Sequence, residues 1–163
     1  ALETSIKEIF QVTCTKLVTC RQREGDELSN LISQKLIGIS GQVALVRKAI
    51  PEIMTRQRKR LNDRLLEYTN GLDNSRVEQE MVLIISRSDV EEELDRLETH
   101  VTETRRVLAT NIPMGRRLDF LMQELNREAN TLGSKSLSDI TTQASIELKV
   151  LIEQIREQIQ NIE

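Results

Sequence analysis

The first fifty residues carry one apolar stripe that only a long helix can place on a single face. From Leu2 to Ile50 the apolar or neutral positions recur in steps of three and four residues, with a mean step of about 3.7, close to the period of a straight helix. A helix of that span is about 70 Å long at about 1.5 Å per residue. A compact globule of all 163 residues would be only about 40 Å across. The chain therefore cannot fold into a compact ball, and we expect a projecting helical arm.

Pro51 interrupts this stripe. Proline removes one helical hydrogen bond and biases the residue before it away from the helical region. We therefore predict a kink or a short turn at Pro51, which starts a second helix that runs to about Tyr68. On this basis we divide the chain into a long helical arm or hairpin at residues 1–70, kinked near Pro51, and a C-terminal helical bundle at residues 71–163.

The pattern of the remaining residues predicts further helices. A helix is expected at about 73–87. A capping-box signal at Ser88-Asp89 predicts either the start of a new helix or a kink in a continuous one, and the helical pattern ends near residue 108. The next helix runs from Gly115 to Leu132, with Gly133-Ser134 as its C-terminal cap, and the last begins near Asp139. No segment alternates with period two for long enough to propose a strand. The predicted fold is all-α: an elongated helical bundle with a long N-terminal arm, about five to six helices and no sheet.

Composition supports this fold class. Aromatic residues make up only 2% of the chain and Trp is absent, so Leu, Ile, Val and Met have to build the core. No apolar run approaches the length of about 20 residues that a membrane span needs, and no signal peptide is recognisable. Cys14 and Cys20 lack the spacing of a zinc site, and we predict that they are reduced thiols. We expect a cytoplasmic protein, and the initial Ala in place of Met suggests a piece of a longer chain.

Charge is distributed in blocks. Residues 47–64 hold seven Lys and Arg residues against two acids, and residues 73–104 hold ten acids against three Arg residues. Residues 105–135 return to an excess of base, with six cations against three acids. Two explanations remain open: a basic surface for a polyanion, or charge pairing between helices.

The segment from Gly115 to Lys135 combines an apolar stripe with an unusually polar opposite side. Asp119, Gln123, Asn126 and Asn130 step by four, three and four, so they stack along one side of a helix. Asn and Asp are mediocre helix formers that prefer caps and turns. Binding is one reason for such a row inside a helix.

Two groups of arginines are candidates for phosphate contacts. Arg56 and Arg60 belong to a cluster with cations all round one helical turn. Arg116-Arg117 begins a helix, where cations oppose the macrodipole. A phosphate bound by the free backbone N–H groups and both guanidinium groups would resolve that conflict, and so would carboxylates from another helix.

The familiar catalytic signatures are missing, which leaves one histidine and helical carboxylates. There is no glycine-rich phosphate loop, GxSxG elbow or HExxH motif. His100 lies on the same side of its predicted helix as Glu93 and Glu103. It could act as a proton shuttle or a metal ligand, or it could be a half-exposed member of a row of ion pairs. Nearby carboxylates could bind Mg²⁺ or Mn²⁺, or simply complement the helix dipole: Asp89, Glu92, Glu93 and Asp95.

Three stretches resemble the C-terminal portion of the YicC family: Asp89–His100, Gly115–Lys135 and Glu147–Gln158. Arg21–Gly25 and Ile50–Ile53 extend the resemblance over essentially the whole chain. The resemblance implies a bacterial, cytoplasmic, stress-associated endoribonuclease that hydrolyses RNA with the help of a divalent metal and assembles as a ring-like hexamer. Members of the family are longer at the N-terminus, where a separate domain precedes the part seen in this chain.

Together with the resemblance, the candidate residues become a proposed nuclease site. A metal ion held by carboxylates would activate water, arginines would clamp the scissile phosphate, and His100 would act as general acid or as ligand. We predict catalytic roles for His100, Glu93, Asp119 and Glu124. We predict metal ligation, with Mg²⁺ or Mn²⁺ as cofactor, by Asp89, Glu92 and Glu128. We predict RNA binding by Arg56, Arg60, Arg96, Arg116, Arg117, Arg127 and Lys135.

Two other functions remain open on the sequence. A non-catalytic RNA-binding module would explain the basic block at 47–64 and the scattered Arg pairs. A helical oligomerisation scaffold, in which coiled-coil seams fill one another, would explain the long first helix. The partner would be RNA for the binding module and further copies of the chain for the scaffold. Neither function involves a membrane.

Overall fold

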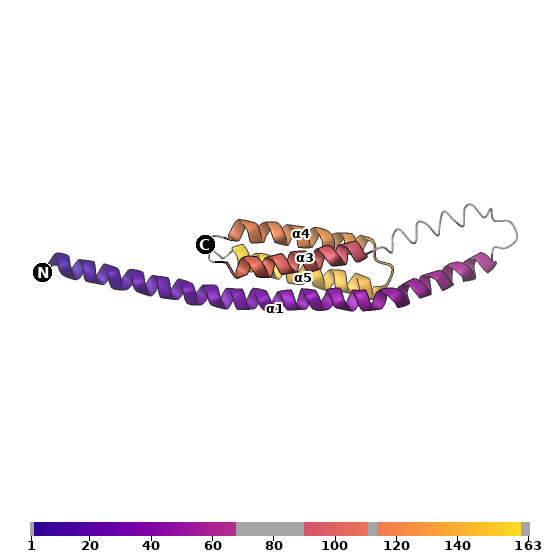
Figure 1. Cartoon of the computed structure of the whole chain (residues 1–163), viewed down its shortest axis with the longest axis horizontal. Helices are drawn as coiled ribbons and strands as arrows, with labels where there is room; N and C mark the ends of the chain where they lie inside the picture. The colour runs from indigo at the N-terminus through magenta and orange to yellow at the C-terminus, as the bar shows by residue number, and fades with distance from the viewer. Residues whose placement is uncertain (1, 68–89, 111–113, 161–163) are drawn as a thin grey trace.

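The computed structural model describes residues 2–67, 90–110 and 114–160, and within 61–67 Asp63 is the one residue whose side chain is described. These residues form four helices and no strand: α1 (Leu2–Glu67), α3 (Glu91–Leu108), α4 (Gly115–Ser134) and α5 (Asp139–Gln160) (Figure 1). The all-α prediction is confirmed, with fewer described helices than the five to six expected. The helix expected at about 73–87 lies outside the described residues. Within the described part, no helix has the length and apolar character needed to cross a membrane.

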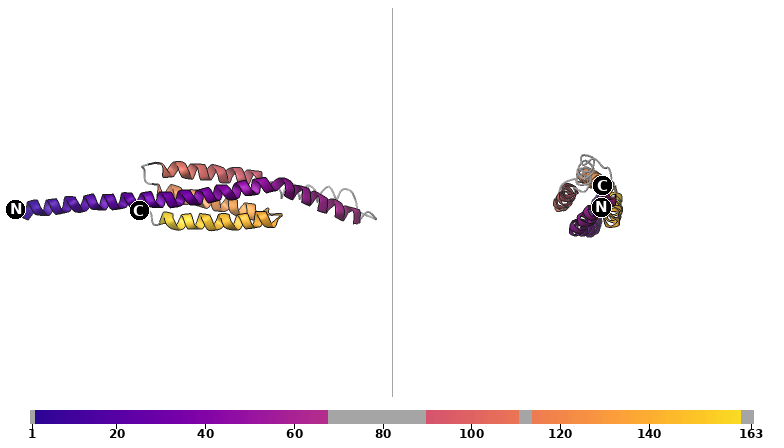
Figure 2. Two further views of the ribbon diagram at one scale, coloured as in Figure 1. Left: turned by 90° about the horizontal axis from the view of Figure 1, so that it is seen from below. Right: turned by 90° about the vertical axis from the view of Figure 1, so that its right-hand side faces the viewer.

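Helix α1 does not stop at Pro51. It is helical over 66 residues with Pro51 inside it, so the prediction of a second helix starting there was wrong. The axis does change direction in the C-terminal third of α1 (Figures 1 and 2), as expected where a proline ring crowds the preceding turn. Ile53, just beyond the proline, is buried. Burial of apolar side chains on the bundle offsets the one missing hydrogen bond, so the helix bends and continues.

The apolar stripe of α1 is buried in one half and exposed in the other. Ile32, Leu36 and Ile39 are completely buried, whereas Leu2 is 78% and Ile9 is 67% exposed. Residues 2–27, which are all exposed and which we call the arm, project beyond the other helices (Figure 1). The arm expected from the length of the stripe is therefore present.

The remaining helices pack beside the middle of α1. Helix α5 contacts α1 and α4, and α3 contacts α1 and α4, so the four described helices enclose one core (Figure 2). The described core is aliphatic, as the composition requires. Each fully buried Leu or Ile contributes roughly 1.5–3 kcal/mol relative to an exposed one. The apolar stripe that the sequence predicts for the segment from Gly115 to Lys135 is buried in α4: Leu118, Leu121, Met122, Leu125, Ala129 and Leu132.

A close approach of α4 and α5 explains Gly133. Helix α4 continues through Ser134, and its C-cap is Lys135 with φ −85°, so the predicted cap at Gly133-Ser134 was wrong. A Cβ at position 133 would lie 2.7 Å from Ser145 Oγ of α5. Glycine is needed here for close packing between helices, because any side chain would collide with Ser145.

Candidate metal centre

The edge where α3 meets α4 is lined by polar residues although the interior of the bundle is apolar. As residue numbers rise along α3, the numbers of the facing residues fall along α4, so the two helices are antiparallel. We call this row the polar edge. Its facing residues are Glu93 and Lys135, Arg96 and Glu128, His100 and Glu124, and Glu103 and Arg117.

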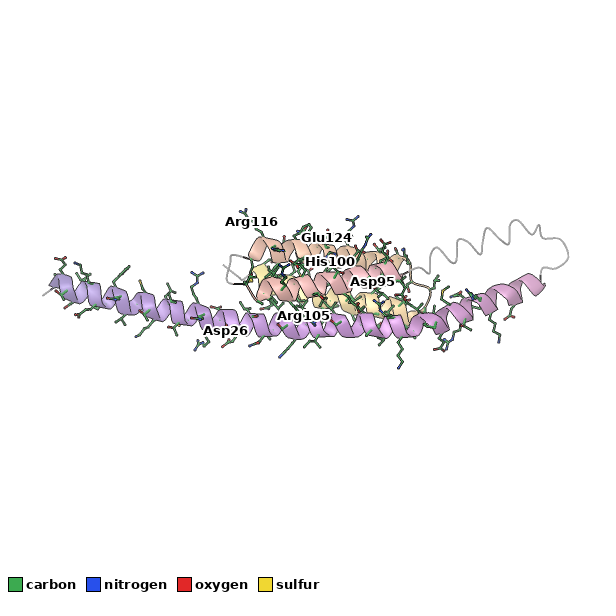
Figure 3. All side chains as sticks on the ribbon, viewed as in Figure 1. Asp26, Asp95, His100, Arg105, Arg116 and Glu124 are labelled. Carbon is green, nitrogen blue, oxygen red and sulfur yellow. The ribbon has the colours of Figure 1, made fainter. Side chains whose placement is uncertain are left out.

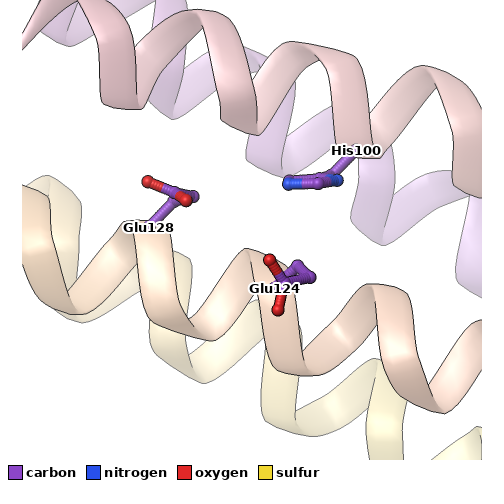
Figure 4. Close-up of side chains that lie close together, drawn as sticks. All are labelled: His100, Glu124 and Glu128. Atoms are coloured by element: carbon purple, nitrogen blue, oxygen red, sulfur yellow. The ribbon is translucent and has the colours of Figure 1, made fainter.

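Three potential metal ligands converge at the middle of the polar edge. The ring of His100 and the carboxylates of Glu124 and Glu128 each offer a donor atom within 4.8 Å of the others. His100 comes from α3 and faces the two glutamates, which lie one turn apart on α4 (Figure 4). Among the described residues, no other group of three or more His, Cys, Asp or Glu side chains gathers in this way.

Two of these potential ligands have no partner among the residues that the structure describes. Within the described part of the chain, neither the His100 ring nor the Glu124 carboxylate takes part in a hydrogen bond or ion pair. Both side chains are half-buried. Half-buried side chains can be hydrated, so these donor atoms are accessible to solvent and to a metal ion.

The third ligand, Glu128, has a weak internal partner. Its side chain is only 4% exposed and accepts a long 3.4 Å hydrogen bond from Arg96 Nη1. Arg96 Nη2 also donates to Glu92 Oε1 at 2.5 Å. The charge of Glu92, and then that of Glu128, raises the pKa of Arg96 above its usual value. One guanidinium is thus shared between two carboxylates, and Glu124 adds a further negative charge beside them.

The donor set fits a divalent cation. Around an ion with ligands at about 2.1 Å, neighbouring donors lie about 3 Å apart and opposite ones about 4 Å apart. The separation of up to 4.8 Å therefore needs a closure of about an ångström, within reach of glutamate rotamers. One imidazole with two carboxylates suits Mn²⁺ better than Mg²⁺, which prefers oxygen ligands.

Glu93 and Lys135 form an ion pair with each other outside this centre. Lys135 Nζ donates to both carboxylate oxygens of Glu93 at 2.9 and 3.1 Å, and the Glu93 side chain is only 6% exposed. This ion pair fastens the start of α3 to the end of α4. The structure does not bring either residue to the three ligands.

The other predicted carboxylates that the structure describes also lie outside the group of three ligands. Glu92 is exposed and binds Arg96. Asp119 accepts a hydrogen bond from Gln123 at 2.8 Å and lies 3.7 Å from Arg156 Nε of α5. Asp89 lies outside the described residues. Of the seven predicted acid–base or metal-binding residues, His100, Glu124 and Glu128 are the ones that the structure gathers.

The predicted arginines of α4 divide into paired and unpaired ones. Arg117 is bound by Glu103 of α3, so a carboxylate from another helix neutralises it. In the described part of the structure, Arg116 and Arg127 have no ion pair or hydrogen bond through their side chains, and both are exposed. Figure 3 shows Arg116 at the start of α4, pointing away from the bundle. These two guanidinium groups remain available to an anionic partner.

Arg56 and Arg60 belong to a separate region. They line a cavity of about 250 Å³ with the segment that joins α4 to α5. Arg56 is paired with Glu52 at 2.7 Å, while Arg60 is exposed and unpaired among the described residues. None of the three gathered ligands lines this cavity.

Charge pairing between helices is directly visible between α1 and α3. Arg47 donates to Glu91 at 3.0 Å, to Asp95 at 2.8 Å and to Glu98 at 3.3 Å. The hydrogen bond to Asp95 is the main cause that raises the pKa of Arg47, and the charges of Glu98 and Glu91 add to it. Part of the basic block thus neutralises part of the acidic block, as one of the two open explanations required.

Residues 46–163 match the family model described as endoribonuclease YicC-like, C-terminal. The chain belongs to this family. It is 47% identical over all 163 residues to the probable endoribonuclease YicC of Haemophilus influenzae and spans 57% of that protein. It is 34% identical over 151 residues, 91% of the chain, to the probable endoribonuclease YicC of Clostridioides difficile and spans 52% of it. The chain thus covers little more than half the length of these curated relatives.

The family assignment confirms the resemblance inferred from the sequence. Every candidate site residue lies within the matched range 46–163. The arm lies before that range, although the Haemophilus influenzae relative aligns with it as well. The polar edge is therefore part of the region that defines the YicC-like C-terminal family.

Proposed function

We propose that the chain carries the metal-binding centre of a metal-dependent endoribonuclease, which hydrolyses phosphodiester bonds of RNA. The observation that carries this proposal is the convergence of His100, Glu124 and Glu128, two of which have no partner among the described residues. Membership of a family described as endoribonuclease YicC-like supports the reaction class. A role in the turnover of small RNA under stress, implied by the resemblance, stays a prediction.

Phosphodiester hydrolysis needs an activated water, compensation of the charge that builds up on the phosphate, and help for the leaving oxygen. A divalent cation, once bound, supplies a water of lowered pKa and positive charge beside the phosphate. His100, Glu124 and Glu128 would hold that cation. Arg96 donates to Glu128 at 3.4 Å and would help to orient that carboxylate.

The unpaired arginines of α4 are suited to hold the RNA backbone. Arg127 lies three residues after Glu124 and Arg116 lies eight residues before it, which places them about 4.5 Å and 12 Å along the helix axis from that glutamate. Phosphate contacts of this kind fix the position of the strand without reading its sequence. We propose that they seat the scissile bond over the centre.

Cleavage of a labelled RNA tests the proposal. The purified chain is incubated with a short RNA in Mn²⁺ and, separately, in EDTA. Glu124→Gln removes one charge and keeps the shape, so we expect cleavage to fall by about a hundredfold or more. Glu147→Gln on α5 is the matched control, because Glu147 is also a half-buried helical glutamate and lies outside the centre. Its cleavage rate should equal that of the unaltered chain.

The outcomes separate the proposal from its alternatives. Cleavage that persists in EDTA, or that Glu124→Gln leaves unchanged, contradicts a metal centre at the polar edge. RNA binding without cleavage under every metal condition favours a non-catalytic binding module. Because phosphate contacts weaken steeply with salt, this binding should be sought first at low ionic strength.

We also propose that the protein assembles into homo-oligomers, a hexamer by family resemblance, through the arm. The arm exposes Ile6, Phe10 and Leu17 by 58%, 70% and 59%. Its apolar stripe continues the stripe that packs into the core farther along α1. An extended apolar surface of this kind is typical of a protein–protein contact. A second copy that presents the same stripe would bury it.

A further inference from the structure

The exposed phenylalanine on α4 stands out in a chain with few aromatic residues. Phe120 is 57% exposed, and the chain has only one other Phe, one Tyr and no Trp. The apolar stripe of α4 lies on another face of the helix and is complete without it. A single exposed apolar side chain is ordinary on a protein surface. The position of this ring, described next, is what gives it significance.

Phe120 lies between an unpaired arginine and the candidate metal centre. It is four residues after Arg116 and four residues before Glu124, so all three project from the same side of α4 on successive turns. Each step of four residues is about 6 Å along the helix. Arg127, also unpaired in the described part, follows two turns after Phe120. The ring is thus flanked by cations and next to a ligand of the proposed cation.

This combination matches what single strands offer. An unpaired nucleobase has a free aromatic face, and proteins that bind single strands provide aromatic rings for stacking and cations for the phosphates. In an RNA duplex the bases stack on each other, and the surface that a protein meets is phosphate and 2′-hydroxyl. A phenylalanine ring therefore discriminates in favour of an unpaired nucleotide.

We propose that Phe120 stacks on an unpaired nucleobase while Arg116 and Arg127 bind phosphates of the same strand, so that the RNA is single-stranded where it meets the polar edge. The statement that this strand is the one being cut rests on the proposed function. The stacking itself needs no metal ion, and it can be measured without cleavage.

Binding in EDTA tests the stacking directly. Fluorescence anisotropy gives the Kd of a short single-stranded oligoadenylate and of a short RNA duplex for the unaltered chain and its variants. Phe120→Ala should weaken binding of the single strand by about 5- to 100-fold, and Phe120→Trp should retain it because indole also stacks. Duplex binding should be unchanged in both variants.

Ile146→Ala is the control. Ile146 is also an exposed large apolar residue, at 48%, but it lies on α5, outside both the polar edge and the arm. This variant should leave the Kd of the single strand unaltered. Circular dichroism is expected to show native helix content in every variant, because both side chains are on the surface.

Several results would overturn the inference. Unchanged single-strand binding by Phe120→Ala would show that the ring does not stack, and an equal loss for duplex and single strand would show general electrostatic binding. No binding of oligoadenylate by the unaltered chain would also overturn it. A change of mass in light scattering for Phe120→Ala, without a change in RNA affinity, would assign the ring to a contact between proteins.

The same variants keep this inference separate from the proposed function. Suppose that the unaltered chain and Phe120→Ala both cleave RNA with Mn²⁺ and bind the single strand with the same Kd. In that case the stacking inference alone fails. If Phe120 proves necessary for single-strand binding but no divalent ion supports cleavage, the proposed function alone fails.

Discussion

At the scale of single residues, Glu128 combines burial with charge more sharply than the other ligands. A carboxylate that is 4% exposed loses most of its hydration, and its internal compensation is a 3.4 Å bond from an arginine that also binds Glu92. Such a group is costly for stability unless something else neutralises it. A protein retains it where function requires it.

Glu128→Gln should therefore separate metal binding from folding. The amide keeps the volume and can still accept the hydrogen bond from Arg96, while the buried charge disappears. We expect Mn²⁺ binding to be lost and the metal-free unfolding free energy to change by less than about 1 kcal/mol. Urea unfolding in EDTA measures the second quantity. A variant that unfolds much more easily, or that still binds Mn²⁺, would contradict this assignment of Glu128.

Arg96 should compete with the cation. Its guanidinium lies against Glu128, so it repels a divalent ion bound to that carboxylate. We expect Arg96→Gln to tighten Mn²⁺ binding by about fivefold, while Arg96→Lys, which keeps the charge, should stay near the unaltered value. Weaker Mn²⁺ binding by Arg96→Gln would show instead that Arg96 acts chiefly by orienting Glu128.

The sequence predicted the three side chains of the candidate centre, but it did not predict which residues face each other across α3 and α4. His100, Glu124 and Glu128 were all candidates, but His100 was grouped with Glu93 and Glu103 of its own helix. The pairing across helices depends on the antiparallel register of α3 and α4, which helical periodicity within one segment does not determine. One signal was available: Arg96 and His100 are four apart, as are Glu124 and Glu128, so two antiparallel helices can match them pairwise.

At the scale of helices, packing overrides local rules in two places. Pro51 was expected to end a helix and Gly133 to cap one, yet both lie inside helices. The apolar stripe of α1 continues past Pro51 to the buried Ile53, and the contact of Gly133 with Ser145 requires the absence of a side chain. Neither reason is local, because each depends on a neighbouring helix.

Gly133→Ala should destabilise the bundle although alanine is the better helix former. The new methyl group would collide with Ser145 Oγ at 2.7 Å, which we expect to cost about 1–3 kcal/mol. The double variant Gly133→Ala, Ser145→Ala removes that oxygen and leaves only a 3.5 Å contact, so it should recover most of the loss. Ser145→Ala alone is the control in chemical denaturation. A stabilising Gly133→Ala would show that the helices are farther apart than described.

At the scale of the whole molecule, the elongated shape follows from one helix that is longer than its bundle. The sequence predicted this shape, since the stripe from Leu2 to Ile50 exceeds the diameter of a globule of this size. Within a single chain the arm contributes no buried residue to the core. Its apolar side chains therefore add little to the stability of the monomer, and we propose that they act in contacts between molecules.

Replacing apolar residues of the arm should change assembly without changing folding. We expect the combined variant Ile6→Ser, Ile9→Ser, Leu17→Ser to keep the unfolding midpoint of the bundle, because these side chains are exposed in the monomer. Its mass in light scattering should fall below that of the unaltered chain. A control with Lys7, Glu8 and Gln11 replaced by Ser should keep the assembled mass. Equal masses for both variants would remove the arm from assembly.

Titration with Mn²⁺ followed by electron paramagnetic resonance shows most directly whether the polar edge is a divalent-metal centre. We predict saturable binding of a single ion per chain, lost in His100→Ala and in Glu124→Gln and retained in Glu147→Gln. Absence of saturable binding, or binding that survives both changes at the polar edge, would contradict it.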